Sequence, residues 1–116
     1  MNYIVDSLGQ KEVLAMSPGE QLLDFVHLDD VLRLCLQLLD EKPKNTLEDI
    51  YVGTGIGTTL KEAAQLIEIL STKKTAIDFG GIPYRMEEKM ENIAPIGKNR
   101  FWKASIAIED GFLTLL

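Results

Sequence analysis

The stretch from about Asp30 to Asp40 predicts a helix that is apolar on two adjoining sides. Helical spacing gives one stripe of Val31, Leu34, Cys35 and Leu38, and a second stripe of Leu32, Leu36 and Leu39. A helix of this kind needs packing partners on two sides, and a chain of 116 residues supplies few further layers. The chain is therefore expected to form a homo-oligomer or to pack against another folded body.

Composition and charge exclude several classes of protein. With 46% hydrophobic and 26% charged residues, the chain is expected to be one globular domain over residues 1–116. Its net charge of −6 argues against a nucleic-acid partner. One cysteine and one histidine exclude an internal disulfide and argue against a metal site. No apolar run of about 18 residues and no signal-peptide pattern is present, so we expect a cytoplasmic protein without a membrane partner.

Alternating patterns predict a small mixed α/β domain. Helices are expected within residues 1–11, 30–40, 59–70 and 105–116, and strands at 12–16, 21–28, 49–53 and 75–79. Pro18 and Gly19 predict a type II turn, after which residues 21–28 would return as the next strand. Asp29 or Asp30 is expected to cap the apolar helix.

Residues 52–59 (VGTGIGTT) raise the question of a dinucleotide site. They lie between a predicted strand and a predicted helix, and Asp78 ends the next strand, as in a dinucleotide-binding fingerprint. Thr58 occupies the place of the third glycine, however, and Thr59 with Glu62 forms a capping box for the helix. We favour a tight structural turn. A minimal NAD-binding protein remains an alternative.

His27 and Cys35 are the candidates for a general base and a nucleophile. His27 could act as a general base with Asp24 or Asp29 as its orienting partner, but along a strand it shares a face with Phe25 and Asp29 while Asp24 points away. A lone histidine here is more often hydrogen-bonded and partly buried. Cys35 is expected in the core. The sequence therefore predicts no catalytic residue.

The loop of residues 82–90 (IPYRMEEKM) places Arg85 beside Tyr84, with Glu87 and Glu88 following. Arginine presents a planar fork that suits a diphosphate, and tyrosine offers a stacking face. The alternative is a solvated loop with a local ion pair between Arg85 and a glutamate, worth under about 1 kcal/mol. Both interpretations remain open at this point.

Several stretches occur in the order and spacing of motifs from one known family. Residues 21–31 (QLLDFVHLDDV) are similar to Q-x-R-D-F-V-x-V-D-D-V, and residues 50–55 (IYVGTG) to Y-N-V-G-S-G. Residues 80–90 (GGIPYRMEEKM) are similar to the I-P-Y-R-x-N-E-x-M loop of the branch that makes CDP-linked dideoxysugars. Together they resemble the C-terminal part of the extended short-chain dehydrogenases, the NAD-dependent sugar-nucleotide epimerases and dehydratases.

The resemblance implies a substrate-binding lobe from surface-polysaccharide sugar biosynthesis. Arg85 would contact the diphosphate of a nucleotide sugar and Glu88 its ribose, with Tyr84 and Gln21 also in the substrate site. Leu23 stands where the family has its other phosphate-binding arginine, so affinity for the nucleotide sugar is expected to be weak.

The resemblance also implies what the chain does not supply. Family members bind NAD or NADP through the G-x-x-G-x-x-G turn of an N-terminal Rossmann domain and react through a Y-x-x-x-K pair, and neither pattern occurs in these residues. We expect no cofactor bound by this chain alone, no metal and no activity alone. The alternative function is a non-catalytic interaction module that forms homo-oligomers or docks on a separate Rossmann partner.

Overall fold

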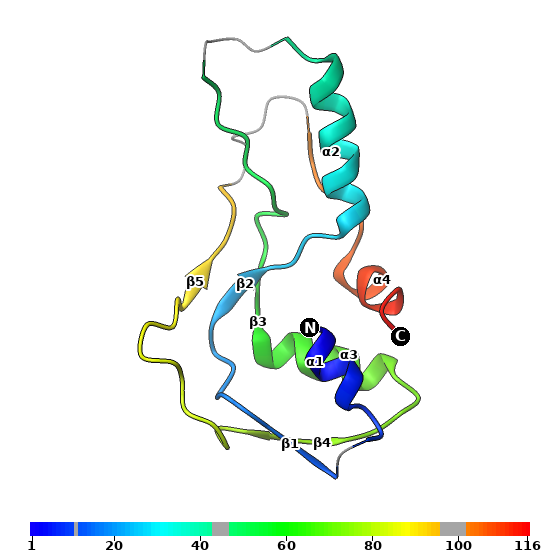
Figure 1. The fold of residues 1–116 in the computed structure, drawn as a ribbon, viewed down its shortest axis with the longest axis vertical. Coiled ribbons are helices and arrows are strands. Elements are labelled where there is room, and N and C mark those ends of the chain that lie inside the picture. Colours follow the sequence, from blue (N-terminus) through cyan, green and yellow to red (C-terminus); the bar gives the residue numbers. More distant parts are fainter. Residues whose placement is uncertain (11, 43–46, 96–101) are drawn as a thin grey trace.

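The computed structural model describes residues 1–10, 12–42, 47–95 and 102–116 of the protein. Its elements (Figure 1) are α1 (Asn2–Ser7), β1 (Val13–Met16), β2 (Leu22–Asp24), α2 (Leu28–Asp40), β3 (Gly57–Thr59), α3 (Leu60–Leu70), β4 (Ala76–Phe79), β5 (Glu91–Asn92) and α4 (Ile108–Leu113). This mixed α/β composition confirms the predicted fold class. No helix in the described ranges is long and apolar enough to cross a membrane.

The strands form two separate small sheets. β1 pairs in parallel with β4, and β2 lies between antiparallel β3 and parallel β5. The prediction that residues 21–28 return beside the first strand is therefore wrong. Gly19 has a positive φ of 77°, as the turn required, but its carbonyl accepts a hydrogen bond from the Lys61 amide at 2.9 Å. That bond directs the chain across the start of α3 and away from β1.

The hydrophobic core surrounds α3. Ala63, Ala64 and Ile67 lie on one face of the helix by their spacing, and all three are fully buried. They pack with buried residues of α1, β1 and α4, which are Ile4, Leu14, Met16 and Phe112, and with Leu8. The predicted capping box is confirmed: Thr59 Oγ1 accepts from the Glu62 amide at 3.1 Å, and the Glu62 carboxylate accepts from the Thr59 amide at 2.9 Å.

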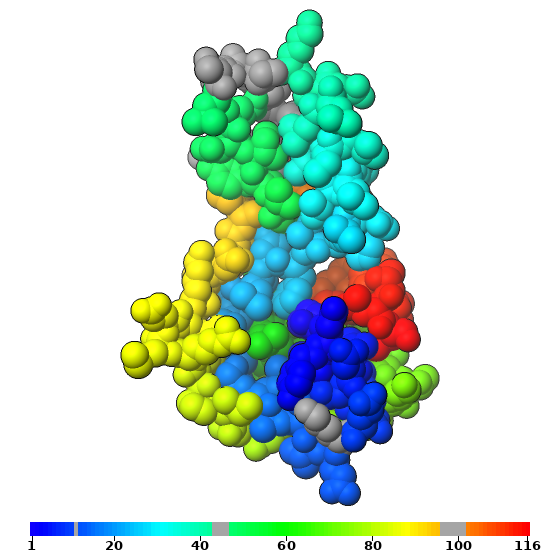
Figure 2. Space-filling view, viewed as in Figure 1, coloured from blue at the N-terminus to red at the C-terminus, as the bar shows by residue number. Residues whose placement is uncertain are grey.

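Helix α2 projects away from this core. The radius of gyration is 16.8 Å, whereas a compact chain of this length has about 13 Å. Figure 2 shows α2 and residues 47–56 in the narrow upper part, above the lower part that contains α1. Of the apolar residues of α2, Leu34 is buried, whereas Leu36 is 66% and Leu39 82% exposed. Cys35 is exposed as well, so its predicted place in the core is wrong: of its stripe, Leu34 is buried but Cys35 is not.

The strand predicted at residues 49–53 is not formed. These residues have no ladder partner among the described strands, and the strand of this region is β3, a few residues later. Between them, the amides of Thr54 and Gly55 donate to the carboxylate of Asp24, both at 2.8 Å. Because these bonds bring the chain to the end of β2, the sheet begins at Gly57 and not at residue 49.

Candidate functional site

The loop of residues 80–90 is fixed at both ends to the rest of the fold. At its start, the amides of Gly80 and Ile82 donate to the Met16 carbonyl at 2.9 and 3.1 Å. At its end, the Met90 carbonyl accepts from the Leu22 amide at 2.8 Å, and β5 continues this pairing. The loop therefore has a defined place beside β2.

Tyr84 anchors the middle of this loop. Its hydroxyl accepts from the Glu20 amide at 2.9 Å and donates to the Glu20 carboxylate at 3.3 Å. Gln21, the next residue, is buried, and its Oε1 has no hydrogen-bond partner among the described atoms. The fold thus brings Tyr84 next to the segment that contains Gln21, and it uses the tyrosine hydroxyl to hold the loop.

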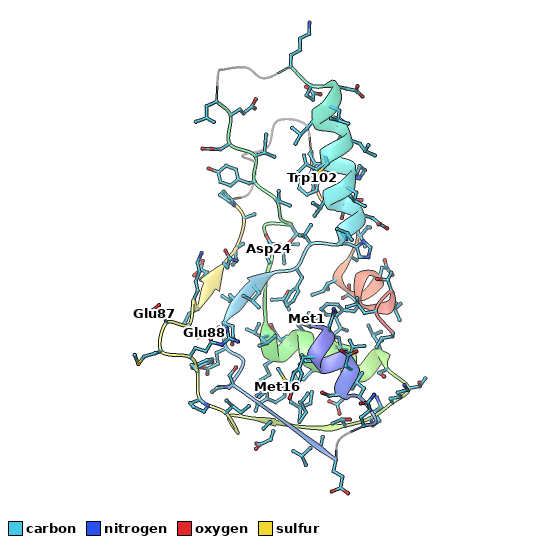
Figure 3. All side chains as sticks on the ribbon, viewed as in Figure 1. Met1, Met16, Asp24, Glu87, Glu88 and Trp102 are labelled. Atoms are coloured by element: carbon cyan, nitrogen blue, oxygen red, sulfur yellow. The ribbon has the colours of Figure 1, made fainter. Side chains whose placement is uncertain are left out.

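Arg85 and Glu88 are the two ends of one turn. The Glu88 amide donates to the Arg85 carbonyl at 3.1 Å. Arg85 is exposed, and within the described ranges it forms no ion pair with a carboxylate, so the local pair with a glutamate is not formed. Figure 3 shows Glu87 at the outer edge of the loop and Glu88 on the side toward β2. The guanidinium is therefore available to an external anion.

Asp24 organises the glycine-containing turn. Burial raises the pKa of its carboxyl group, but hydrogen bonds from the Thr54 hydroxyl and from the amides of Thr54, Gly55 and Ala94 outweigh this effect and lower the pKa. A Cβ on Gly53 would lie 2.5 Å from Asp24 Oδ2, so this glycine is needed for the close approach. Figure 3 places Asp24 between β2 and this turn. Asp24 therefore holds the turn and does not orient His27.

These contacts bear on the dinucleotide interpretation. A glycine-rich turn binds phosphate through free backbone amides at the start of a helix. In this chain the amides of Thr54 and Gly55 already donate to Asp24, and the amide of Thr59 donates to Glu62. The geometry thus favours the structural turn over the NAD-binding alternative.

His27 caps α2. Its Nδ1 accepts from the Asp29 amide at 3.1 Å, which gives the histidine the capping role predicted for Asp29 or Asp30. Nδ1 must then be unprotonated, so Nε2 carries the hydrogen and donates to Thr114 Oγ1 at 3.2 Å. The Thr114 hydroxyl in turn donates to the Gly111 carbonyl at 2.6 Å. Nδ1 thus caps α2, while Nε2 connects the start of α2 with the residue that follows α4.

Asp30 is buried, and sequence reasoning missed its role. Its carboxylate accepts from Arg33 and from the amides of Ser105 and Ile106, at 3.0 and 2.9 Å. Burial raises the pKa of Asp30, and the hydrogen bonds from Ile106, Arg33 and Ser105 outweigh it, lowering the pKa to about 2. The Asp-Asp pair before the helix was the signal, but the sequence did not show which aspartate turns inward.

Two of the cavities among the described residues lie beside α4. One of about 370 Å³ is lined by His27, Phe112 and Thr114 among others, and one of about 310 Å³ by Phe25, Thr58 and Ser105 among others. Neither is lined by Gln21, Tyr84, Arg85 or Glu88. A search of the described residues finds no cluster of three or more metal-ligating side chains. The residues predicted to bind the substrate therefore lie outside these two cavities, on the loop and next to β2.

Comparisons with known proteins find relatives in sequence and in fold. No protein-family model matches the chain. The chain is 28% identical over 116 residues to CDP-abequose synthase of Salmonella muenchen and 30% identical over 121 residues to that of Salmonella typhimurium. Each match covers 98% of this chain and 40% of the relative. A putative GDP-L-fucose synthase 2 of Arabidopsis thaliana is 30% identical over 105 residues, covering 86% of this chain and 30% of that protein.

Solved structures support the same fold. UDP-glucose 4-epimerase of Thermotoga maritima, solved with UDP-glucose, matches with a TM-score of 0.77 at 22% identity, over 97% of this chain and 37% of that one. RMD from Pseudomonas aeruginosa, complexed with NADPH, matches with a TM-score of 0.72 at 17% identity, over 98% and 38%. The chain thus spans about 40% of the length of the first two curated relatives and somewhat less of these structures.

Proposed function

We propose that this chain, which belongs to the extended short-chain dehydrogenase/reductase family and corresponds to its C-terminal part, carries the nucleotide-sugar-binding surface of an NAD-dependent epimerase or dehydratase. The names of its relatives, CDP-abequose synthase and GDP-L-fucose synthase, support a nucleoside diphosphate sugar as the ligand class. A sugar for a surface polysaccharide is the proposed product of the pathway.

The single observation that carries this proposal is that Arg85 lies in a fixed loop but is not paired with a carboxylate of the described residues. The loop around it is fixed by the bond between Tyr84 and Glu20 and by the pairing of β5, yet the guanidinium has no carboxylate partner among the described residues. A fixed backbone with an uncompensated arginine suits a diphosphate, which accepts two parallel N–H bonds from the fork. Glu88, at the other end of the same turn, would accept hydrogen bonds from the ribose hydroxyls.

Hydride transfer needs a held nicotinamide and a positioned acid-base group. The 116 residues contain neither the family's glycine-rich cofactor turn nor its Y-x-x-x-K pair. We therefore propose that this chain binds a nucleotide sugar without transforming it, and that turnover requires a Rossmann domain.

Replacing Arg85 with alanine is expected to weaken the binding of CDP-glucose or UDP-glucose at least tenfold. The physical reason is the loss of a charge-assisted bond worth about 1.5 to 3 kcal/mol. Isothermal titration calorimetry measures the effect, with Arg85→Lys expected to fall between the two because a lysine keeps the charge and loses the fork. Absence of binding at millimolar ligand, or equal affinity of wild type and Arg85→Ala, contradicts the proposal.

A second candidate function, an interaction module, is favoured by the exposed leucines of α2. Leu32, Leu36 and Leu39 are each more than half exposed on a helix that projects from the core. Large apolar patches of this kind mark interaction surfaces. The proposed partner is a Rossmann domain or, in its absence, a second copy of this chain.

The chain on its own is therefore expected to sediment as a dimer or a larger species at micromolar concentration. The double variant Leu36→Glu/Leu39→Glu should shift the distribution toward monomer, because two carboxylates would have to be desolvated at the contact. Ile69→Glu is the matched control, since Ile69 is 74% exposed on a different helix. A monodisperse wild-type monomer in analytical ultracentrifugation would exclude self-association through α2.

A further inference from the structure

One face of the three-stranded sheet surrounds Leu23 with polar groups. In the ladder, Leu23 is opposite Thr58 of β3 and Asn92 of β5, and opposed residues present their side chains on the same face. Gln21, two residues earlier, continues this face by the alternation of an extended chain. Its buried Oε1 has no partner among the described residues. Amide and hydroxyl groups therefore flank an apolar residue at the centre of this face.

A lysine from the fixed loop reaches the same face. The Lys89 ammonium donates to Asn92 Oδ1 at 3.3 Å. In the part of the chain that the structure describes, Lys89 forms no ion pair with a carboxylate. A neutral amide leaves the positive charge uncompensated, and the ammonium has two further hydrogens to donate. Lys89 can therefore bind an anion without breaking an existing ion pair.

The neighbouring carboxylates do not share this position. Glu91 is opposite Leu22 in the ladder, so its side chain lies on the other face of the sheet. Glu87 lies at the outer edge of the loop. Glu88 is half-buried on the side toward β2, where in the proposed function it accepts hydrogen bonds from the ribose hydroxyls. An anion beside Leu23 would therefore contact the Lys89 ammonium and not one of these carboxylates.

We infer that the Lys89 ammonium supplies, beside Arg85, the second positive charge for the diphosphate of the nucleotide sugar. It would approach from the side of β5 and replace the arginine that the family has at the position of Leu23. The inference rests on the proposed function and deepens it. The side chain at position 23 is apolar and cannot donate, whereas Asn92 directly opposite holds the ammonium of Lys89 on the same face. Lysine acts as a point charge without a fork, so the site would hold the diphosphate less tightly than two arginines would.

The experiment is a double-mutant cycle on the full 116-residue chain, with CDP as the probe and cytidine as the probe without phosphate. Lys89→Ala is expected to weaken CDP binding about tenfold and to leave cytidine binding unchanged, whereas Lys89→Arg should keep CDP affinity within about threefold. Leu23→Arg should strengthen CDP binding. In the Leu23→Arg variant, the further change Lys89→Ala should weaken CDP binding by less than about threefold. Lys74→Ala is the matched control, because the Lys74 ammonium donates to the Glu68 carbonyl of α3, outside this face.

Two results would overturn the inference, and they are distinguishable. If Arg85→Ala loses CDP while Lys89→Ala binds it as the wild type does, the proposed function stands and the role of Lys89 is refuted. If neither the wild type nor Leu23→Arg binds CDP at millimolar concentration, the proposed function itself fails. Far-UV circular dichroism of each variant separates loss of binding from loss of fold. Because Lys89 is exposed, its variants test the inference even if Leu23→Arg does not fold.

Discussion

Replacing Asp30 with alanine is expected to lower the free energy of unfolding by about 3 to 4 kcal/mol, a large share of the total for a small domain. The Asp30 carboxylate is 1% exposed and accepts from Arg33, Ser105 and Ile106. Without it, the amides of Ser105 and Ile106 lose their acceptor, and α2 loses its connection to the segment before α4. Urea unfolding followed by circular dichroism measures the difference.

The neighbouring aspartate provides the control. Asp29→Ala should cost less than about 1 kcal/mol, because the Asp29 side chain is 72% exposed and its helix cap uses the backbone amide. Asp30→Asn keeps the shape of the side chain and removes the charge. Its loss of unfolding free energy should therefore lie between those of the two alanine variants. Equal stability of Asp30→Ala and Asp29→Ala would show that the buried network does not hold α2.

The same group gives a pH dependence. The folded-state pKa of Asp30 is lowered from 3.8 to about 2, so the unfolded chain takes up this proton at a higher pH than the folded chain. The stability that Asp30 contributes is therefore complete above about pH 4 and is lost as the pH falls through 2, amounting to about 2 kcal/mol. In Asp30→Asn this part of the acid dependence should be absent.

Replacing Ile67 with alanine is expected to lower the free energy of unfolding by about 3 kcal/mol. Ile67 is fully buried on α3, where it packs with Leu14 of β1, Phe112 of α4 and the rest of the core cluster. Truncation leaves a cavity at the point where these elements meet. Denaturant unfolding monitored by tryptophan fluorescence and circular dichroism measures the loss.

Ile69 on the same helix is the matched control. It is 74% exposed, so Ile69→Ala should change the free energy of unfolding by no more than about 0.5 kcal/mol. Similar losses for the two variants would mean that the core does not lie on the face of α3 that contains Ile67.

Helix α3 illustrates how far the sequence could predict the fold. Thr59 and Glu62 are three residues apart, and the core face repeats at helical spacing, so the start, the length and the buried side of the helix follow from neighbouring residues. The order and spacing of short motifs likewise indicated the extended short-chain dehydrogenase family. The turn between Arg85 and Glu88 was expected as a loop, and the structure adds that Tyr84 fixes it through Glu20.

Strand pairing was not predictable in the same way. β1 could have paired with the next strand along the chain, but it pairs with β4, more than 60 residues later. The segment at residues 49–53 has a strand-forming pattern, yet β3 begins later because Asp24 binds the turn between them. A pattern of side chains shows that a segment can be a strand, but its partner depends on backbone groups far away in sequence.

The sequence by itself determined the helices, the capping box, the glycine at the turn before β2 and the family, because these depend on residues a few positions apart or on the order of motifs. Only the tertiary structure decided that His27 and not an aspartate caps α2, that Asp30 is buried while Cys35 is exposed, and that Lys89 contacts Asn92, the strand partner of Leu23. Those outcomes depend on which distant segments meet, since burial and hydrogen-bond partners are set by packing between elements and not by the local pattern within one.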